Sequence, residues 1–132
     1  MNLSMLKKPT LIISALVALG VGGAILAVPD AFYASNGITL GPNASLRNEI
    51  RAPGGALVGT GFLMLVGAFV PRIANTGLLI AATIFLGYGF ARLLSMVIDG
   101  VPAINLMAAS GLELTIGLLC LAVLVQANRY NP

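Results

Sequence analysis

The sequence contains no histidine, no tryptophan and one cysteine, Cys120, and only 8% of its 132 residues are charged. The missing histidines exclude His-ligated haem, and a single cysteine cannot form an intrachain disulfide, a CxxC redox pair or a Cys/His zinc site. Because Cys120 lies in an apolar run, we interpret it as a small hydrophobic side chain. Soluble domains carry about 25% charged residues. The shortage of charge, with a mean hydropathy of +1.01, therefore indicates an integral membrane protein.

Four apolar segments are each long enough to cross a bilayer, which takes about 20 residues. They cover residues 9–28, 52–70, 75–98 and 104–127. Short connections follow the second and third segments, so these neighbours are expected to be antiparallel. The predicted fold class is all-α, a bundle of four transmembrane helices in one integral membrane domain covering residues 1–132. The first segment is long for the apolar part of a signal peptide, and we interpret it as a span.

The link between the first two segments, residues 29–51, is longer and contains two turn signals. Between these signals, residues 38–40 fit a short extended piece. Asn43 or Ser45 is a suitable N-cap for a helix that continues through Pro53 with a kink, which makes the second helix longer than hydropathy indicates. We expect an ordered loop that packs over one end of the bundle.

Basic residues near the helix ends predict the orientation in the membrane. With the N-terminus in the cytoplasm, the inner side holds Lys7, Lys8, Arg72 and Arg129, and the outer side holds Arg47 and Arg51. This distribution favours an N-in, C-in arrangement with the long loop outside. The predicted location is the bacterial inner (cytoplasmic) membrane, as a multi-pass protein.

Two charged residues lie within the apolar segments, Arg92 in the third and Glu113 in the fourth. An arginine at membrane depth costs about 2.5–3.5 kcal/mol on insertion scales, so it normally faces a partner or a water-filled cavity. Both residues lie at nearly equal distances from the turn near Pro102, roughly 10–15 Å below it at 1.5 Å per residue. We therefore predict that their side chains pair.

Helical spacing adds further polar side chains to this region. Tyr88, Ser95 and Asp99 share the face of Arg92, and the outer end of the second segment is within reach. The predicted polar cluster consists of Glu49, Arg51, Tyr88, Arg92, Ser95, Asp99, Asn105 and Glu113. Three roles remain open: a clamp that fixes helix register, a site for a ligand or lipid headgroup, and a path for protons or ions. Arg92 also has the alternative of extending to the outer headgroups.

Small residues form stripes on the predicted helices, and such stripes allow membrane helices to approach closely. The predicted helix-packing residues are Ser14, Ala18, Gly22, Gly55, Gly59, Gly67 and Gly117. Gly55 and Gly59 form a GxxxG motif. Packing inside the bundle and contact with another subunit both stay open for these stripes.

Two stretches, 29-PDAFYASNGITLGPNASLRNEIRAPGGALVGTGFLML-65 and 87-GYGFARLLSMVIDGVP-102, resemble the DUF4345 family of small bacterial membrane proteins. The most specific parts are Asn48 to Gly55 and Arg92 to Pro102, and the resemblance covers nearly the whole chain. It implies a four-span architecture but no activity, because the family is uncharacterised. The motif positions that it implies are Glu49, Arg51, Arg92, Ser95, Asp99 and Gly100.

The sequence contains no pair of carboxylates placed to flank a scissile bond, no Ser/His/Asp set, no phosphate loop and no metal-ligand spacing. We therefore expect no enzymatic activity, no cofactor and no nucleic-acid partner. Two hypotheses remain. The favoured one is an accessory subunit that packs against a larger membrane complex or against copies of itself. The alternative is a protein, such as a transporter, that binds a small molecule or lipid at the Arg92–Glu113 cluster.

Overall fold

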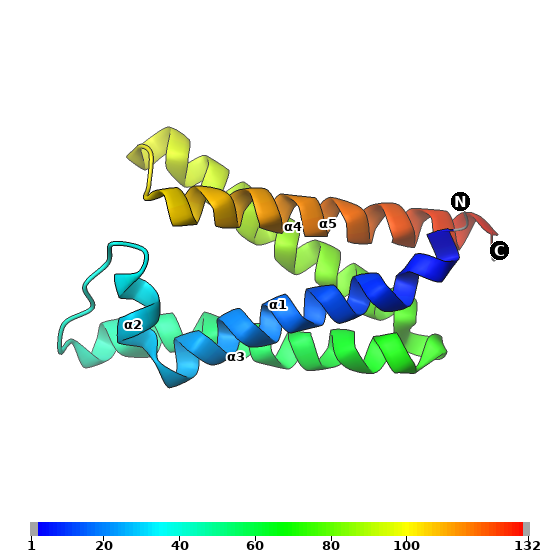
Figure 1. Ribbon diagram of the computed structural model, residues 1–132, viewed down its shortest axis with the longest axis horizontal. Helices are drawn as coiled ribbons and strands as arrows, with labels where there is room; N and C mark the ends of the chain where they lie inside the picture. Colours follow the sequence, from blue (N-terminus) through cyan, green and yellow to red (C-terminus); the bar gives the residue numbers. More distant parts are fainter. Residues whose placement is uncertain (1–2, 131–132) are drawn as a thin grey trace.

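The computed structural model describes residues 3–130, which form helices and no strand. A short 3₁₀-helix η1 (Leu3–Leu6) leads into α1 (Lys7–Ala27), and a six-residue helix α2 (Pro29–Ala34) follows. After a loop come α3 (Ala44–Phe69), the 3₁₀-turn η2 (Pro71–Ile73), α4 (Ala74–Asp99) and α5 (Ile104–Tyr130). Figure 1 shows the four long helices side by side, with both ends of the described chain at the same end of the bundle.

Four helical stretches are long and apolar enough to cross a membrane. They are Lys7–Ala27, Ala44–Phe69, Pro71–Asp99 and Ile104–Arg129. These stretches confirm the four predicted spans and the all-α fold class, and they make the chain a multi-pass membrane protein by length and composition.

The extension of the second span is also confirmed. The side chain of Asn43 caps α3 by accepting a hydrogen bond from the backbone N–H of Leu46 at 3.1 Å. Asn is among the best N-cap residues because its side-chain oxygen satisfies a donor that the first turn leaves free. The helix then continues through Pro53.

The link between α1 and α3 differs from the prediction because it begins with a helix. Pro29, the first residue of the predicted link, begins α2, and residues 38–40 belong to no helix or strand. Proline suits the first position of a helix because its missing N–H has no intrahelical partner there, and Asp30 in the same turn faces the positive end of the helix dipole.

The long helices form two antiparallel pairs. α1 packs mainly on α3 and α4 on α5, and the contact between α3 and α4 joins the pairs. In Figure 1 the pairs lie together near the chain ends and diverge toward the end that carries α2. The fully buried Leu11, Met64, Leu78 and Val123 come from the parts of the helices nearest the chain ends. The tight core therefore occupies one half of the bundle.

Glycines set the spacing within each pair. A Cβ atom on Gly22 of α1 would lie 2.7 Å from the carbonyl oxygen of Gly54 in α3. In the other pair, Gly89 lies against Leu114 and Gly117 against Leu86. A larger side chain at any of these positions would force the facing side chain or the facing backbone to shift, so the glycines allow the helices to approach this closely.

Five of the seven predicted packing residues are buried: Ser14, Ala18, Gly22, Gly67 and Gly117. Gly55 and Gly59 are exposed, and a Cβ atom on either would meet nothing within 4 Å. The interpretation that this GxxxG motif packs inside the bundle is therefore wrong, because Gly54 and Gly61 occupy the inward face of α3 instead. A contact with another chain stays a prediction for Gly55 and Gly59.

Candidate functional site

An ion pair links α4 to α5. The Nε atom of Arg92 donates a hydrogen bond to Oε2 of Glu113 at 2.9 Å, which confirms the predicted pairing. The side chains are 31% and 14% exposed. Gly89 lies one turn before Arg92 and Gly117 one turn after Glu113, and both accommodate a leucine of the facing helix. The close approach of the helices thus brings a guanidinium and a carboxylate together in mainly apolar surroundings.

The other members of the predicted cluster divide into two groups. Those on α4 and α5 lie in the region of the ion pair, whereas the two on α3 do not. Ser95 donates to Oδ2 of Asp99 at 2.8 Å, and the side-chain amide of Asn105 donates to the carbonyl of Ser35 at 2.8 Å. Tyr88 lines the same cavity as Arg92. The predicted region therefore does contain these side chains, although Asp99 itself is exposed and outside the cavity lining.

Glu49 and Arg51 do not join the cluster. Both are exposed on the first turns of α3, and no hydrogen bond within residues 3–130 connects either to the Arg92–Glu113 pair. The hydrogen bond from Arg47 is the main cause of the lowered pKa of the Asp30 carboxyl, and the charge of Arg51 makes a smaller contribution to the same shift. The expectation that the outer end of α3 reaches the pair is wrong, because this stretch of α3 faces outward.

A cavity of about 570 Å³ opens between the two helix pairs, next to the ion pair. Its walls come from all five α-helices and from the loop after α2. Most of the lining is apolar, including Val17, Val21, Ile25, Leu57 and Phe85. The polar side chains of the lining are Tyr33, Ser35, Asn36, Tyr88, Arg92, Ser95, Asn105 and Glu113. Small-molecule sites in proteins typically have volumes of about 300–1,000 Å³ and this mixture of apolar walls and few polar groups.

Helix α2 and its loop contribute to the cavity wall. Phe32 and Tyr33 pack edge to face, with ring centroids 5.4 Å apart, and both line the cavity. Burial raises the pKa of the Tyr33 hydroxyl above its ordinary value of 10.0. The bond from Asn105 to Ser35 connects this segment to α5 on the far side.

Arg47 anchors the same segment to α3. Its guanidinium donates to both carboxylate oxygens of Asp30, at 2.7 and 2.9 Å, and to the carbonyl of Gly41. The hydrogen bond from Arg47 holds the pKa of Asp30 below its ordinary value of 3.8. Sequence reasoning placed both residues on the outer side but missed the pair. The sequence places opposite charges toward the two ends of one loop, but the path of the loop, which brings them together, depends on α2.

Polar contacts at the opposite end of the bundle were also missed. Lys7 donates to Oδ1 of Asn75 at 2.9 Å, and Asn75 donates to Oδ1 of Asn128 at 3.0 Å, so one chain of bonds ties α1, α4 and α5. Deeper inside, Oγ of Ser14 lies 3.3 Å from Sγ of Cys120 in a fully buried contact. Within residues 3–130, no three His, Cys, Asp or Glu side chains come together as metal ligands do.

A family model described as "Domain of unknown function (DUF4345)" matches residues 6–124. The chain belongs to the DUF4345 family. The DUF4345 match includes the ion pair, α2 and the cavity lining, so this site lies within the shared domain. No curated protein and no solved structure matches the chain. Membership of DUF4345 therefore indicates no particular activity, and a proposal about function has to be argued from the geometry of the site.

Proposed function

We propose that this protein binds an uncharged or zwitterionic amphiphile in the cavity between its helix pairs, without catalysing a reaction. The proposal rests on one observation: the Arg92–Glu113 ion pair lines an otherwise mainly apolar cavity of about 570 Å³. An amphiphile fits both parts, with its apolar body among Val17, Val21 and Leu57 and its polar group beside the pair.

The charge of the site determines the class of ligand. Among residues 3–130, Arg92 and Glu113 are the only charged residues in the lining, and their charges cancel. An anionic or cationic group added here would leave a net charge in apolar surroundings, which is costly unless it is paired. The guanidinium carries five N–H donors, and the Nε–H is the one bonded to Glu113. The terminal nitrogens therefore suit a neutral acceptor such as a carbonyl, ester or hydroxyl oxygen.

The proposed setting is the bacterial inner membrane, with both ends of the chain in the cytoplasm. Four basic residues at the end of the bundle near the chain termini support this orientation under the positive-inside rule. The cavity then lies in the outer half of the membrane, with α2 on the outer side. A ligand reaches such a site from the outer leaflet or from the space outside the membrane.

A role as an accessory subunit is the second candidate. Its support is the exposed pair Gly55 and Gly59 on α3, which leave open space for a close helix contact with another chain. A subunit of this kind co-purifies with a larger membrane protein in mild detergent, and Gly55→Leu breaks that association. A ligand-binding protein needs no such partner and is unaffected by Gly55→Leu.

The binding proposal is tested by blocking the cavity. Ala109 lines it one turn before Glu113, whereas the neighbouring Ala108 is exposed and lies outside the lining. Native mass spectrometry of the protein purified from its membrane compares wild type, Ala109→Trp and Ala108→Trp. We expect a bound amphiphile in wild type and Ala108→Trp and none in Ala109→Trp. The absence of a bound molecule in wild type, or equal retention by both variants, contradicts the proposal.

A further inference from the structure

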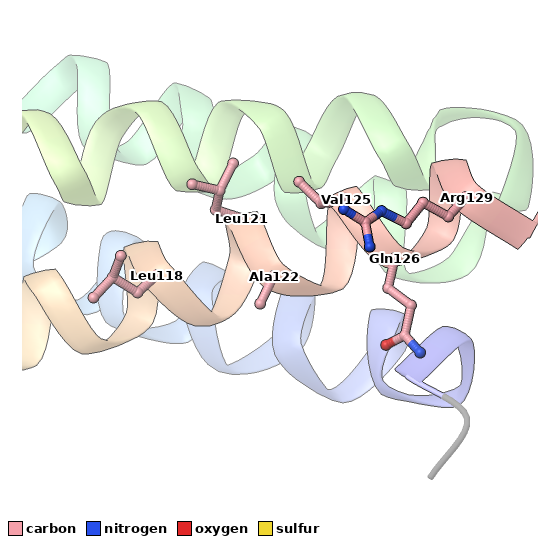
Figure 2. A pocket seen from close by; sticks show the side chains of 6 residues that line it. All are labelled: Leu118, Leu121, Ala122, Val125, Gln126 and Arg129. Carbon is pink, nitrogen blue, oxygen red and sulfur yellow. The ribbon is translucent and has the colours of Figure 1, made fainter.

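A second concave surface lies on the outside of α5, away from the cavity. It is a groove of about 640 Å³ lined by Leu118, Leu121, Ala122, Val125, Gln126 and Arg129. These residues recur at helical spacing, so they form one continuous stripe along the last three turns of the membrane-spanning part of α5. Figure 2 shows apolar side chains along this stripe and Arg129 at its end.

Arg129 extends back over the groove. In Figure 2 its side chain runs along α5 toward Val125, so the guanidinium stands at the polar end of an apolar channel. Gln126 adds an amide at the same end, and its Oε1 atom is buried with no hydrogen-bond donor among residues 3–130. The stripe thus changes from apolar to polar within about one helical turn, as the bilayer does between acyl chains and headgroups.

The charges at this end of the molecule have one sign. Lys7 and Lys8 begin α1, Arg72 lies in η2 and Arg129 lies in the last turn of α5, so these cations share the end of the bundle where the described chain begins and ends. The acidic residues lie in α2, at the start of α3, at the end of α4 and in the first half of α5, toward the other end: Asp30, Glu49, Asp99 and Glu113. Two of the cations have contacts of their own, because Lys7 donates to Asn75 and Lys8 lies 4.7 Å above the ring of Phe69. Arg129 is the cation that lies at the end of a groove.

We propose that this groove holds one anionic phospholipid, with an acyl chain along Leu118, Leu121 and Val125 and the phosphate at Arg129. The lateral face of a spanning helix is solvated by lipid, so a groove on it is filled by an acyl chain. The all-cationic end selects the headgroup by charge, since a basic residue near an anionic surface contributes about 1 kcal/mol. This site is separate from the cavity and does not depend on the function proposed for it.

The test offers the purified, full-length protein equal amounts of phosphatidylglycerol and phosphatidylcholine with identical acyl chains and counts retained lipids by native mass spectrometry. Wild type is expected to retain one phosphatidylglycerol in preference to phosphatidylcholine. Arg129→Gln reduces that preference roughly fivefold, the factor that corresponds to about 1 kcal/mol. Arg129→Lys keeps most of it, because the charge remains. Arg72→Gln is the matched control, since it removes one charge from the same end but not from the groove.

A second pair of variants tests the groove itself. Ala122→Trp fills the channel and is expected to lower retention of phosphatidylglycerol while Arg129 is intact, whereas Ala108→Trp on the same helix leaves it unchanged. Circular dichroism and the unfolding midpoint of each variant show that the fold is kept. Equal retention of the two lipids by wild type overturns the proposal, and so does an equal loss in Arg129→Gln and Arg72→Gln. The proposal is also overturned if a photoreactive residue placed at position 122 cross-links to another protein in native membranes.

Discussion

At the scale of single residues, the protein neutralises a guanidinium within an apolar helix by pairing it across the helix contact. The pairing of Arg92 with Glu113 followed from the sequence because an antiparallel hairpin places residues equidistant from its turn at the same depth. The pairing of Asp30 with Arg47 did not follow, because α2 was not predicted and its geometry decides where Asp30 points. Depth along a straight helix can be counted from the sequence, whereas the path of a loop cannot.

The ion pair predicts strong coupling between its two residues. Arg92→Met or Glu113→Leu alone leaves one charge unpaired and is expected to destabilise the protein by about 2–3 kcal/mol, somewhat less than a fully buried pair. The double variant leaves no unpaired charge, and we expect it to recover more than half of that loss. SDS titration in mixed micelles, followed by circular dichroism, measures all three variants. Additive losses in the double variant would show that the two side chains do not interact.

At the scale of elements, glycine contacts set the distance between helices. Hydropathy located three of the spans within a few residues, and the N-cap signal at Asn43 was needed to place the start of α3. The spacing of small residues predicted close helix contacts, but it did not show which glycines of α3 make them. That helix is apolar on several sides, so its inward face depends on where α1 and α4 lie. The structure selects Gly54 and Gly61 and leaves Gly55 and Gly59 outside.

The contact between α1 and α3 predicts different costs for two glycines on α1. A methyl group on Gly22 meets the backbone oxygen of Gly54 at 2.7 Å and Cβ of Leu57 at 2.9 Å, so the helices must separate. We expect Gly22→Ala to lower the free energy of unfolding by about 1–3 kcal/mol. Gly20→Ala is the control, because nothing lies within 4 Å of its added methyl group, and its stability should equal or exceed that of wild type. A similar loss in both variants would contradict this packing.

The attachment of α2 depends on pH through Asp30. Its pKa in the folded chain lies below its ordinary value of 3.8, so the contact with Arg47 contributes fully above about pH 4 and is lost as the pH falls through the lowered pKa. A spin label on Thr39→Cys, in a Cys120→Ala background, should become more mobile over that acidic range. With Asp30→Asn added, the label should be mobile at every pH. The same pH response with and without Asp30→Asn would argue against this anchor.

At the scale of the whole molecule, the divergence of the two helix pairs creates the cavity. The pairs are packed tightly around Leu11, Met64 and Leu78 near the chain ends and separate toward α2, where the polar lining gathers. The sequence indicated the polar lining residues of α4 and α5, but it missed those of α2 and its loop, Tyr33, Ser35 and Asn36. It could not indicate an open volume there, because hydropathy and helical spacing carry no information about the angle between helix pairs.

The absence of tryptophan provides a direct measurement of the central claim, that a cavity with no net charge takes an uncharged amphiphile. Tyr33→Trp places the only indole of the chain in the cavity wall. Its fluorescence is titrated with a brominated long-chain alcohol and with the matching brominated carboxylate, at a pH where the acid is ionised. We predict saturable quenching by the alcohol, weaker quenching by the carboxylate, and loss of the alcohol response when Ala109→Phe is added to the same protein as a non-fluorescent block of the cavity. Stronger quenching by the carboxylate, or equal quenching with the cavity open and blocked, would contradict the account.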